Sequence, residues 1–361
     1  MESKLDKILR KPTNPVQIGD VIVGGKAPVV IQSMTNTKTV DSDATLDQIN
    51  QLYEAGCELV RLAIPDQESV KVFAGIVQRS PLPLIADIHF DARLAHQAME
   101  NGAAKIRVNP GNLGGRRALV ELARRADQLN LPIRIGVNAG SLEKNILKKH
   151  GGATAAALVE SALGYLEALE EIDFTNVLVS LKASDVYTTI SAYRLMSEKK
   201  TYPLHLGVTG AGPYETGVIK GAVGIGALLA EGIGDTLRVS LTASPVEEVR
   251  VARKIVQALG LRRFVPELIS CPTCGRCEVD LIYLAGKVEE ILKDYRLPIK
   301  VAVMGCAVNG PGEAREADLG ISAGKKQGIL FSHGKVIRTV EHTNLLDALI
   351  EELDLLAAKS D

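Results

Sequence analysis

Short apolar runs recur through the first two thirds of the chain and alternate with amphipathic stretches. Eight runs predict strands, at residues 29–31, 59–62, 84–88, 105–108, 133–137, 177–181, 204–208 and 237–240. Most are continuously apolar rather than alternating, which is typical of parallel strands covered on both faces. Stretches between them, such as 44–55, 115–129, 153–169 and 245–259, have helical periodicity, and several open with Ser, Thr or Asp. The pattern therefore predicts repeating β/α units.

The number and spacing of these units favour a closed barrel. From Gln32 to Arg238 the eight strands repeat about every 29 residues, within the range of a (β/α)₈ or TIM barrel. A doubly wound sheet is the alternative, and eight units favour closure. Ahead of the first strand, residues 16–23 read as a small hairpin, which we expect to plug the bottom of the barrel.

The pattern changes after residue 261. A cysteine-rich turn is followed by a helix, an apolar strand, a Gly/Pro loop, three short strands and a closing helix. These elements are expected at 278–292, 299–304, 309–312, 319–322, 328–331, 336–338 and 345–358. We therefore expect two domains, an α/β barrel over 1–261 and a smaller α+β domain over 262–361.

Composition and charge narrow the class of protein. The 361 residues are 46% hydrophobic and 24% charged, and 42 Lys+Arg against 43 Asp+Glu leave a net charge of −1. This balance argues against a nucleic-acid partner. No apolar run approaches the ~18 residues of a membrane span, and the polar start lacks the apolar stretch of a signal peptide. We expect a cytoplasmic protein with no membrane partner.

Basic residues gather near the carboxyl ends of the expected strands, where a barrel carries its active site. Charged side chains in such strands are costly unless they are paired or bind a ligand. Five are basic: Arg61, Arg107, Arg134, Lys182 and Arg238. With Asp87 as the obvious counter-charge, they predict a pocket for a phosphate or diphosphate ester, whose oxygens fit Arg forks. Because strand residues alternate in direction, we expect one or two of the five to turn outward.

Smaller polar groups accompany these cations. The additional candidates at the strand ends are Asn109, Asn138, His205 and Ser240. Asp87 and His89 are two residues apart and would lie on the same side of an extended segment. Such a pair suits acid/base catalysis, and a purely structural hydrogen-bonded pair is nearly as good an interpretation.

Four of the five cysteines fall within a short part of the second domain, namely Cys271, Cys274, Cys277 and Cys306. In a reducing compartment such a group indicates a metal rather than disulfides. Zinc and a [4Fe-4S] cluster both fit, and the spacing does not decide between them. The fourth ligand is either Cys277 or a carboxylate such as Glu313. Three thiolates and one carboxylate would leave an exchangeable position on one iron.

Several ordered blocks resemble a known family, the bacterial 4-hydroxy-3-methylbut-2-enyl diphosphate synthases of the non-mevalonate isoprenoid pathway. The blocks lie at 32–37, 86–90, 106–112, 135–142, 180–184, 232–240, 271–276 and 305–313. The resemblance implies a TIM barrel joined to an iron-sulfur domain similar to the cluster domain of sulfite and nitrite reductases. It also implies reductive ring opening and dehydration of 2-C-methyl-D-erythritol 2,4-cyclodiphosphate, with two electrons passed through a [4Fe-4S] cluster from flavodoxin or ferredoxin.

The resemblance also implies roles for individual residues. The cluster ligands would be Cys271, Cys274, Cys306 and Glu313, which leaves Cys277 as a bystander. The substrate would bind at Arg61, Arg107, Asn109, Arg134, Asn138, Lys182, Arg238 and Ser240. The family is homodimeric, with the cluster domain of one subunit capping the barrel of the other.

One departure from the family bears on proton transfer. Where the family usually has a substrate-facing Glu after the seventh strand, this chain has Gly210. Either Glu215 reaches in from the loop, or Asp87 with His89 supplies the proton chemistry, or Gly210 marks a slow variant. Two other functions stay open: a phosphate-binding barrel enzyme with a structural zinc domain, and a non-catalytic iron-sulfur electron carrier or scaffold.

Overall fold

The structure is a computed structural model, and it describes residues 8–295, 297–306, 315, 317–324 and 326–358. Contacts divide the chain into two units between Arg262 and Arg263, next to the change of pattern seen in the sequence.

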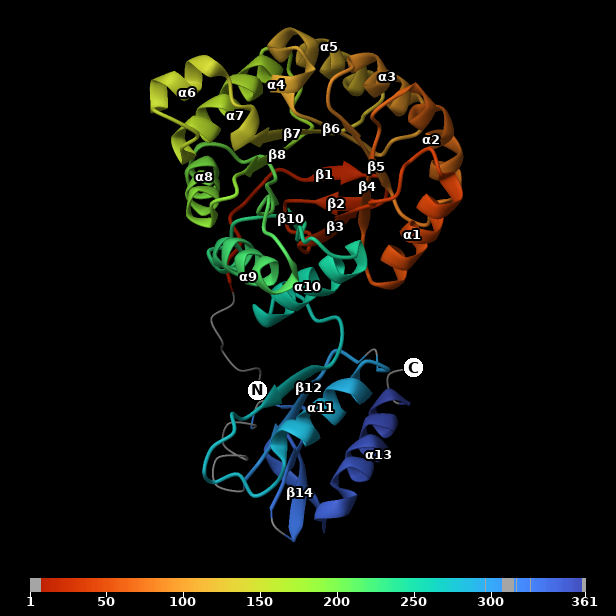
Figure 1. The fold of residues 1–361 in the computed structure, drawn as a ribbon, viewed down its shortest axis with the longest axis vertical. Helices are drawn as coiled ribbons and strands as arrows, with labels where there is room; N and C mark the ends of the chain where they lie inside the picture. The colour runs from red at the N-terminus through yellow and green to blue at the C-terminus, as the bar shows by residue number, and fades with distance from the viewer. Residues whose placement is uncertain (1–7, 296, 307–314, 316, 325, 359–361) are drawn as a thin grey trace. The chain divides into compact units, whose positions relative to one another are not determined.

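The first unit is a parallel eight-stranded barrel (Figure 1). Its strands are β3 (Val30–Met34), β4 (Leu59–Ala63), β5 (Leu84–Ile88), β6 (Lys105–Val108), β7 (Ile133–Asn138), β8 (Val177–Lys182), β9 (His205–Leu206) and β10 (Thr236–Leu237). They are hydrogen-bonded in the order β8-β7-β6-β5-β4-β3-β10-β9. A parallel bridge from Val179 to Leu204 joins the two ends of this order, so the sheet closes. The predicted TIM barrel is confirmed, and the doubly wound alternative is wrong.

Helices form a ring outside the strands (Figure 1). They are α1 (Ser42–Glu54), α2 (Gln67–Arg79), α3 (Ala92–Glu100), α4 (Pro110–Leu113), α5 (Gly115–Gln128), α6 (Lys144–His150), α7 (Ala155–Glu170), α8 (Val186–Lys199), α9 (Tyr214–Ala230) and α10 (Pro245–Ala258). Most begin at a residue whose side chain accepts a hydrogen bond from a free backbone N–H of the first turn. Those caps are Asp41, Asp66, Asp91, Thr154, Asp185 and Ser244.

An N-terminal hairpin closes the amino end of the barrel. Its antiparallel strands are β1 (Val16–Ile18) and β2 (Val21–Val23). Their buried side chains pack against the first inward residues of four barrel strands, which are Val30, Leu59, Ile85 and Leu178. Figure 1 shows the hairpin inside the ring of strands. The predicted plug is therefore present, and it leaves the carboxyl end of the barrel as the end from which a ligand can enter.

The second unit is a five-stranded mixed sheet with two helices. Its elements are β11 (Glu267–Ser270), α11 (Leu281–Leu292), β12 (Lys300–Met304), β13 (Leu319–Ser322), β14 (Gln327–Ser332), β15 (Lys335–Glu341) and α13 (Leu345–Ala357). The strands are ordered β11-β12-β13-β14-β15, the first three parallel and the last two antiparallel to their neighbours. Apolar residues of α11 and α13 pack on the sheet around Val301 and Ile321.

Most of this second unit agrees with the α+β prediction. Strand β11 was missed, because its residues are only partly buried and show no apolar run. The predicted Gly/Pro loop at 309–312 lies outside the described residues. The likeness to reductase cluster domains stays a prediction. Across the described part of the chain, no helix combines the length and the apolar character that a membrane span requires.

Candidate functional site

The barrel strands place their charged residues at inward positions. Residues two apart on a strand face the same side, so the inward series that starts at Leu59 on β4 continues with Arg61. In the same way Ile85 on β5 is followed by Asp87. The register then pairs Asp87 with Arg107 of β6, and Arg107 with Arg134 of β7. The strand pairing alone therefore brings these side chains into one space.

All five predicted cations meet in this space. Arg61, Arg107, Arg134 and Lys182 are each less than 9% exposed, and the Arg238 side chain is 17% exposed. Burial, followed by repulsion from the four arginines, lowers the pKa of Lys182 well below its ordinary value. The expectation that one or two of the five turn outward is wrong, because all five occupy inward positions.

Asp87 is the carboxylate at the centre of the arginines. Its Oδ1 lies 3.0 Å from Arg107 Nη1, and its Oδ2 lies 3.6 Å from Arg61 Nε. Burial raises the pKa of Asp87, but Arg61, then His89 and Arg107, outweigh burial and hold it well below its ordinary range. Asp87 is therefore an ionised anchor for the two arginines.

His89 stands at the outer edge of this group. Its Nε2 lies 3.4 Å from Asp87 Oδ2 and 3.2 Å from Arg107 Nη1. The side chain is 42% exposed, whereas Asp87 is 3% exposed. The predicted Asp87–His89 pair is thus present, with the carboxylate inside and the imidazole where a ligand can touch it.

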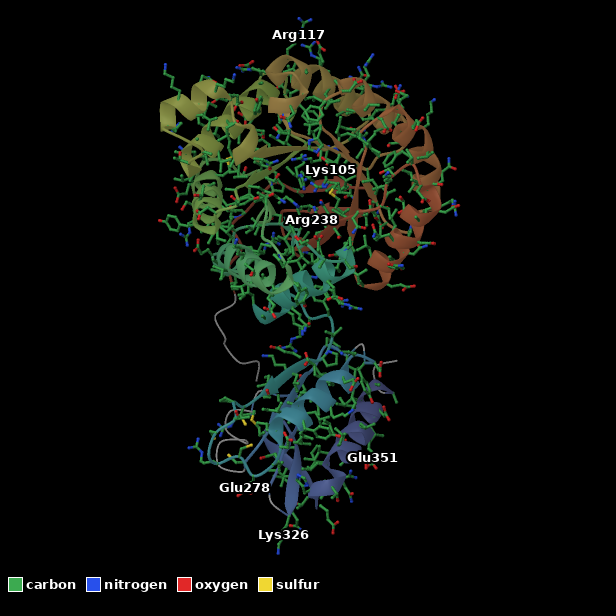
Figure 2. The ribbon with its side chains drawn as sticks, viewed as in Figure 1. Lys105, Arg117, Arg238, Glu278, Lys326 and Glu351 are labelled. Atoms are coloured by element: carbon green, nitrogen blue, oxygen red, sulfur yellow. The ribbon has the colours of Figure 1, made fainter. Side chains whose placement is uncertain are left out.

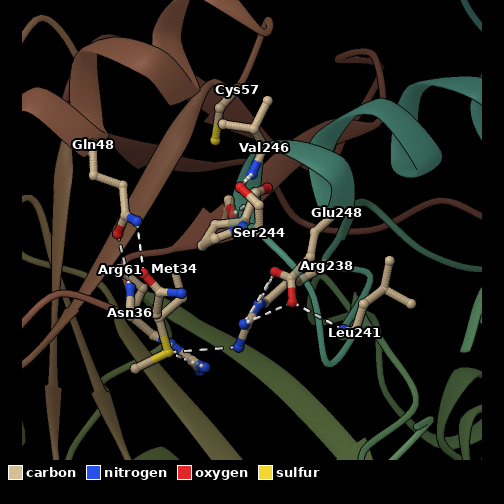
Figure 3. A network of polar contacts seen from close by, with 12 residues as sticks. Met34, Asn36, Gln48, Cys57, Arg61, Arg238, Leu241, Ser244, Val246 and Glu248 are labelled. Carbon is tan, nitrogen blue, oxygen red and sulfur yellow. Dashed lines mark hydrogen bonds and ion pairs between the residues drawn. The ribbon is translucent and has the colours of Figure 1, made fainter. Parts of the chain in front are cut away.

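Besides Asp87, the cations have a second counter-charge, which pairs with Arg238 and which the sequence analysis missed. The Arg238 guanidinium lies 3.1 Å from the buried carboxylate of Glu248, on the first turn of α10 (Figure 3). Glu248 also accepts the backbone N–H of Leu241. On the inner side, the Sδ of Met34 accepts hydrogen bonds from Arg61 and Arg238 (Figure 3). These contacts fix both guanidinium groups at the mouth of the barrel.

Two glycines give the long cations room to fold across the barrel wall. A Cβ on Gly136 would lie 2.8 Å from the Arg107 guanidinium, and a Cβ on Gly207 would lie 2.7 Å from Lys182 Nζ. The absence of a side chain at these two positions therefore helps set where the cations lie. Sequence reasoning missed them, because a glycine inside a strand carries no chemical group to notice.

The remaining predicted residues lie at different depths. Asn109 is buried and donates to Ser141 Oγ at 2.6 Å, while Asn138 and Ser240 are half-buried. His205 is fully buried below the cations. Burial, followed by Arg134 and the neighbouring lysines, lowers the pKa of His205 well below its ordinary value. It is therefore a neutral residue of the barrel interior.

Glu215 stands apart from this network. It lies in the first turn of α9 and is exposed, and within the described residues no hydrogen bond or ion pair links it to the cations. Gly210, where the resembled family has a glutamate, has φ +61°. A side chain in that left-handed conformation costs about 1–2 kcal/mol. The loop after β9 is thus built for glycine here.

The cysteines gather at the carboxyl edge of the second sheet. Cys271 follows β11 and Cys306 follows β12, and these strands are parallel neighbours with Ser270 paired to Val303. The Gly305 N–H donates to Cys271 Sγ at 3.3 Å, so Cys271 lies beside the residue that precedes Cys306. Cys274 is exposed in the same turn. Three thiols thus come from one edge, which fits a metal with soft ligands.

Cys277 also lies beside this edge, because its Sγ is the nearest atom that a Cβ on Gly305 would meet. Its thiol donates to the Val279 carbonyl at 3.3 Å, and like Cys271 it packs against the apolar core. Glu313 lies outside the described residues. Among the residues that are described, no three His, Cys, Asp or Glu side chains are arranged as a metal site. The chain thus brings the cysteines to one edge without fixing them in a ligand geometry.

Comparison with known proteins agrees with both units. Residues 13–253 match the GcpE TIM-barrel domain, and residues 267–355 match the GcpE protein C-terminal domain. A protein of Anoxybacillus flavithermus named 4-hydroxy-3-methylbut-2-en-1-yl diphosphate synthase (flavodoxin) is 53% identical over 350 residues, covering 97% of this chain and 96% of its own. A Bacillus subtilis protein of the same name is 52% identical over 348 residues, covering 96% and 92%.

Solved structures show the barrel fold alone. A spore coat polysaccharide biosynthesis protein of Bacillus subtilis superposes with a TM-score of 0.50 at 11% identity, over 69% of this chain and 74% of its own. At that identity the likeness carries no information about chemistry.

Proposed function

The chain belongs to the GcpE family of 4-hydroxy-3-methylbut-2-en-1-yl diphosphate synthases, and we propose that its barrel holds the substrate while its second unit delivers the electrons. The protein is an iron-sulfur oxidoreductase that converts 2-C-methyl-D-erythritol 2,4-cyclodiphosphate to 4-hydroxy-3-methylbut-2-en-1-yl diphosphate. The observation that carries the proposal is the convergence of five basic side chains inside the barrel mouth.

The cations match the charge of the substrate. A cyclic diphosphate has one ionised oxygen on each phosphorus, and Arg and Lys side chains in a dry site bind such oxygens strongly. We assign this role to Arg61, Arg107, Arg134, Lys182 and Arg238, with Asn109, Asn138 and Ser240 as further donors and His205 below them. The Asp87 and Glu248 carboxylates keep Arg61, Arg107 and Arg238 in place before substrate arrives, which lowers the cost of organising the site.

The reaction needs one proton as well as two electrons. A ring C–O bond to phosphate breaks and releases the phosphate end as an anion, while a carbon-bound hydroxyl leaves as water and takes up the proton. We assign the proton donor to His89, because it is the acid/base side chain that is both exposed and held against Asp87. Glu215 is the weaker candidate, since it lies on the exposed first turn of α9.

The two candidates can be separated by substitution. His89→Gln should lower kcat about 10²–10⁴-fold with little change in KM, whereas Glu215→Gln should leave both constants within about twofold. The reverse result would make Glu215 the donor and leave His89 a structural partner of Asp87.

The second unit would hold a [4Fe-4S] cluster through Cys271, Cys274, Cys306 and Glu313. Three thiols from one sheet edge fit such a cluster, and we assign no ligand role to Cys277, whose thiol donates to the Val279 carbonyl. When bound, the cluster supplies the two electrons of the reduction. The name shared by the relatives supports flavodoxin as the electron donor, and ferredoxin is the alternative.

We also propose a homodimer in which the cluster domain of one subunit caps the barrel of its partner. An exposed face of α9 supports self-association, because Ile219 and Val223, one turn apart, are exposed on it. We place the protein in the cytoplasm, where the clustered cysteines stay reduced.

Turnover tests this function directly. Anaerobically purified, iron-loaded protein should consume the cyclic diphosphate with a reduced viologen dye as electron source, and Cys306→Ser should abolish consumption. A protein that loads iron but shows no turnover would favour the non-catalytic carrier or scaffold. Zinc in place of iron would favour the phosphate-binding enzyme with a structural metal.

A further inference from the structure

Below the mouth of the barrel lies a second polar layer, most of whose residues have no role in the proposed reaction. It contains Gln32, Lys105, His205 and Thr236, each two residues before a position at the mouth, and it shares Arg134 with the substrate site; we call these five residues the barrel floor. Figure 2 shows Lys105 within the ring of strands. Beneath the floor the apolar residues of the hairpin seal the barrel.

The floor residues are buried but have polar atoms without protein partners. All five are 0–1% exposed. Among the described residues, no hydrogen-bond partner exists for Lys105 Nζ, Thr236 Oγ1, both side-chain polar atoms of Gln32, both ring nitrogens of His205, or Nε and Nη1 of Arg134. A buried polar group without a partner costs about 1–3 kcal/mol. So many in one place indicate a bound species that supplies the partners.

The charges of the floor indicate an anion. The charged groups that act on Lys105 are Arg134 and Arg61, both cations. His205 has Arg134, Lys182, Lys105 and Arg61 as its charged neighbours, so its environment is also positive. A water molecule would satisfy hydrogen bonds here but would not offset the repulsion between a buried ammonium and a buried guanidinium.

The barrel interior as a whole also carries more positive than negative charge. Six basic side chains, those of Arg61, Lys105, Arg107, Arg134, Lys182 and Arg238, face two carboxylates, those of Asp87 and Glu248. A cyclic diphosphate at the mouth would add two negative charges and would still leave the interior positive. This last step rests on the proposed function, whereas the unpartnered atoms and the local charges do not.

We propose that the barrel floor binds a small inorganic anion such as chloride, anchored by Lys105 and Arg134 with Gln32 and Thr236 as neutral donors. The ion links Lys105 to Arg134 and so holds the Arg134 guanidinium from below, while its upper side faces the substrate site.

Thermal unfolding of the full chain without substrate tests the floor site. At constant ionic strength, replacing glutamate by chloride should raise the unfolding midpoint of the wild type by a few degrees, because an ion that binds only the folded state stabilises it. Lys105→Met, which keeps the length and removes the charge, should lose this chloride-specific rise. Lys71→Met, at an exposed position of α2, should keep it.

A crystallographic measurement covers the case in which Lys105→Met does not fold. Wild-type crystals soaked in bromide should show an anomalous peak between Lys105 Nζ and Arg134. Water-like density without anomalous signal, or a wild-type midpoint that does not distinguish chloride from glutamate, would overturn the proposal and show a hydrated floor with a neutral lysine. Neither measurement uses turnover, so either result is independent of the enzymatic assignment.

Discussion

The barrel and the cysteine-bearing unit organise their functional groups in different ways. In the barrel, strand register and buried ion pairs hold the arginines around Asp87 at distances of 3.0 and 3.6 Å. In the second unit, Cys271 and Cys306 share a sheet edge, but Cys274 is exposed and the Cys277 thiol donates to the Val279 carbonyl. The first site is built by the protein chain, whereas the second needs its metal to complete it, as expected where metal binding is coupled to folding.

Removing iron should have the largest effect, and it should change the stability of the second unit but not that of the barrel. Chelation should abolish turnover and lower the unfolding temperature of the second unit, since a metal bound only by the folded state stabilises the unit that holds it. The barrel should unfold at its original temperature. Differential scanning calorimetry of iron-loaded and iron-free protein would resolve the two transitions, and an equal shift of both would contradict the division of roles.

Asp87→Asn should have the next largest effect, and it should fall on the barrel. The substitution leaves Arg61 and Arg107 buried without their shared carboxylate, and breaking such buried pairs costs about 3–5 kcal/mol. Chemical denaturation would measure this loss. The control Asp91→Asn removes an exposed ion pair with Arg93 and should cost no more than about 1 kcal/mol. Similar losses in the two variants would show that Asp87 does not anchor the arginines.

Gly136→Ala should act on substrate binding more than on stability. Its Cβ would contact the Arg107 guanidinium at 2.8 Å, so the guanidinium must move and kcat/KM should fall about 10–100-fold, or about 1.4–2.7 kcal/mol. Gly140→Ala, where a Cβ meets no atom within 4 Å, is the matched control. Unchanged kinetics in Gly136→Ala would show that the position of Arg107 does not matter for the reaction.

The smallest effect concerns the acid limit of barrel stability. Because the folded pKa of Asp87 lies below its unfolded value of about 3.9, its contribution is present above that value and is lost as pH falls toward the folded pKa. Between about pH 4 and pH 2 the wild type should therefore lose stability faster than Asp87→Asn. Parallel acid unfolding curves followed by circular dichroism would contradict this assignment.

The sequence predicted the parts of the structure that depend on local pattern. Eight apolar runs predicted eight strands, and a polar residue within such a run is conspicuous, which is why Arg107 and Lys182 were found. Asp87 was found in the same way. The alternation of strand residues, however, led to the expectation that one or two of the five cations turn outward, whereas all five face inward.

The parts that were missed depend on tertiary contacts. Glu248 lies on a helix whose acidic neighbour Glu247 resembles it in sequence, and only packing shows which of the two is buried. Gly136 matters through the space it leaves for Arg107. Lys105 begins a strand and resembles an ordinary edge residue until the barrel closes around it.

The arrangement of the cations implies that the barrel is a complete anion site before any cluster is present. Isothermal titration of iron-free protein with the cyclic diphosphate would test this. The iron-free wild type should bind about as tightly as the iron-loaded protein, and Arg107→Met should lose this binding. Binding that requires iron, or that survives in Arg107→Met, would contradict this.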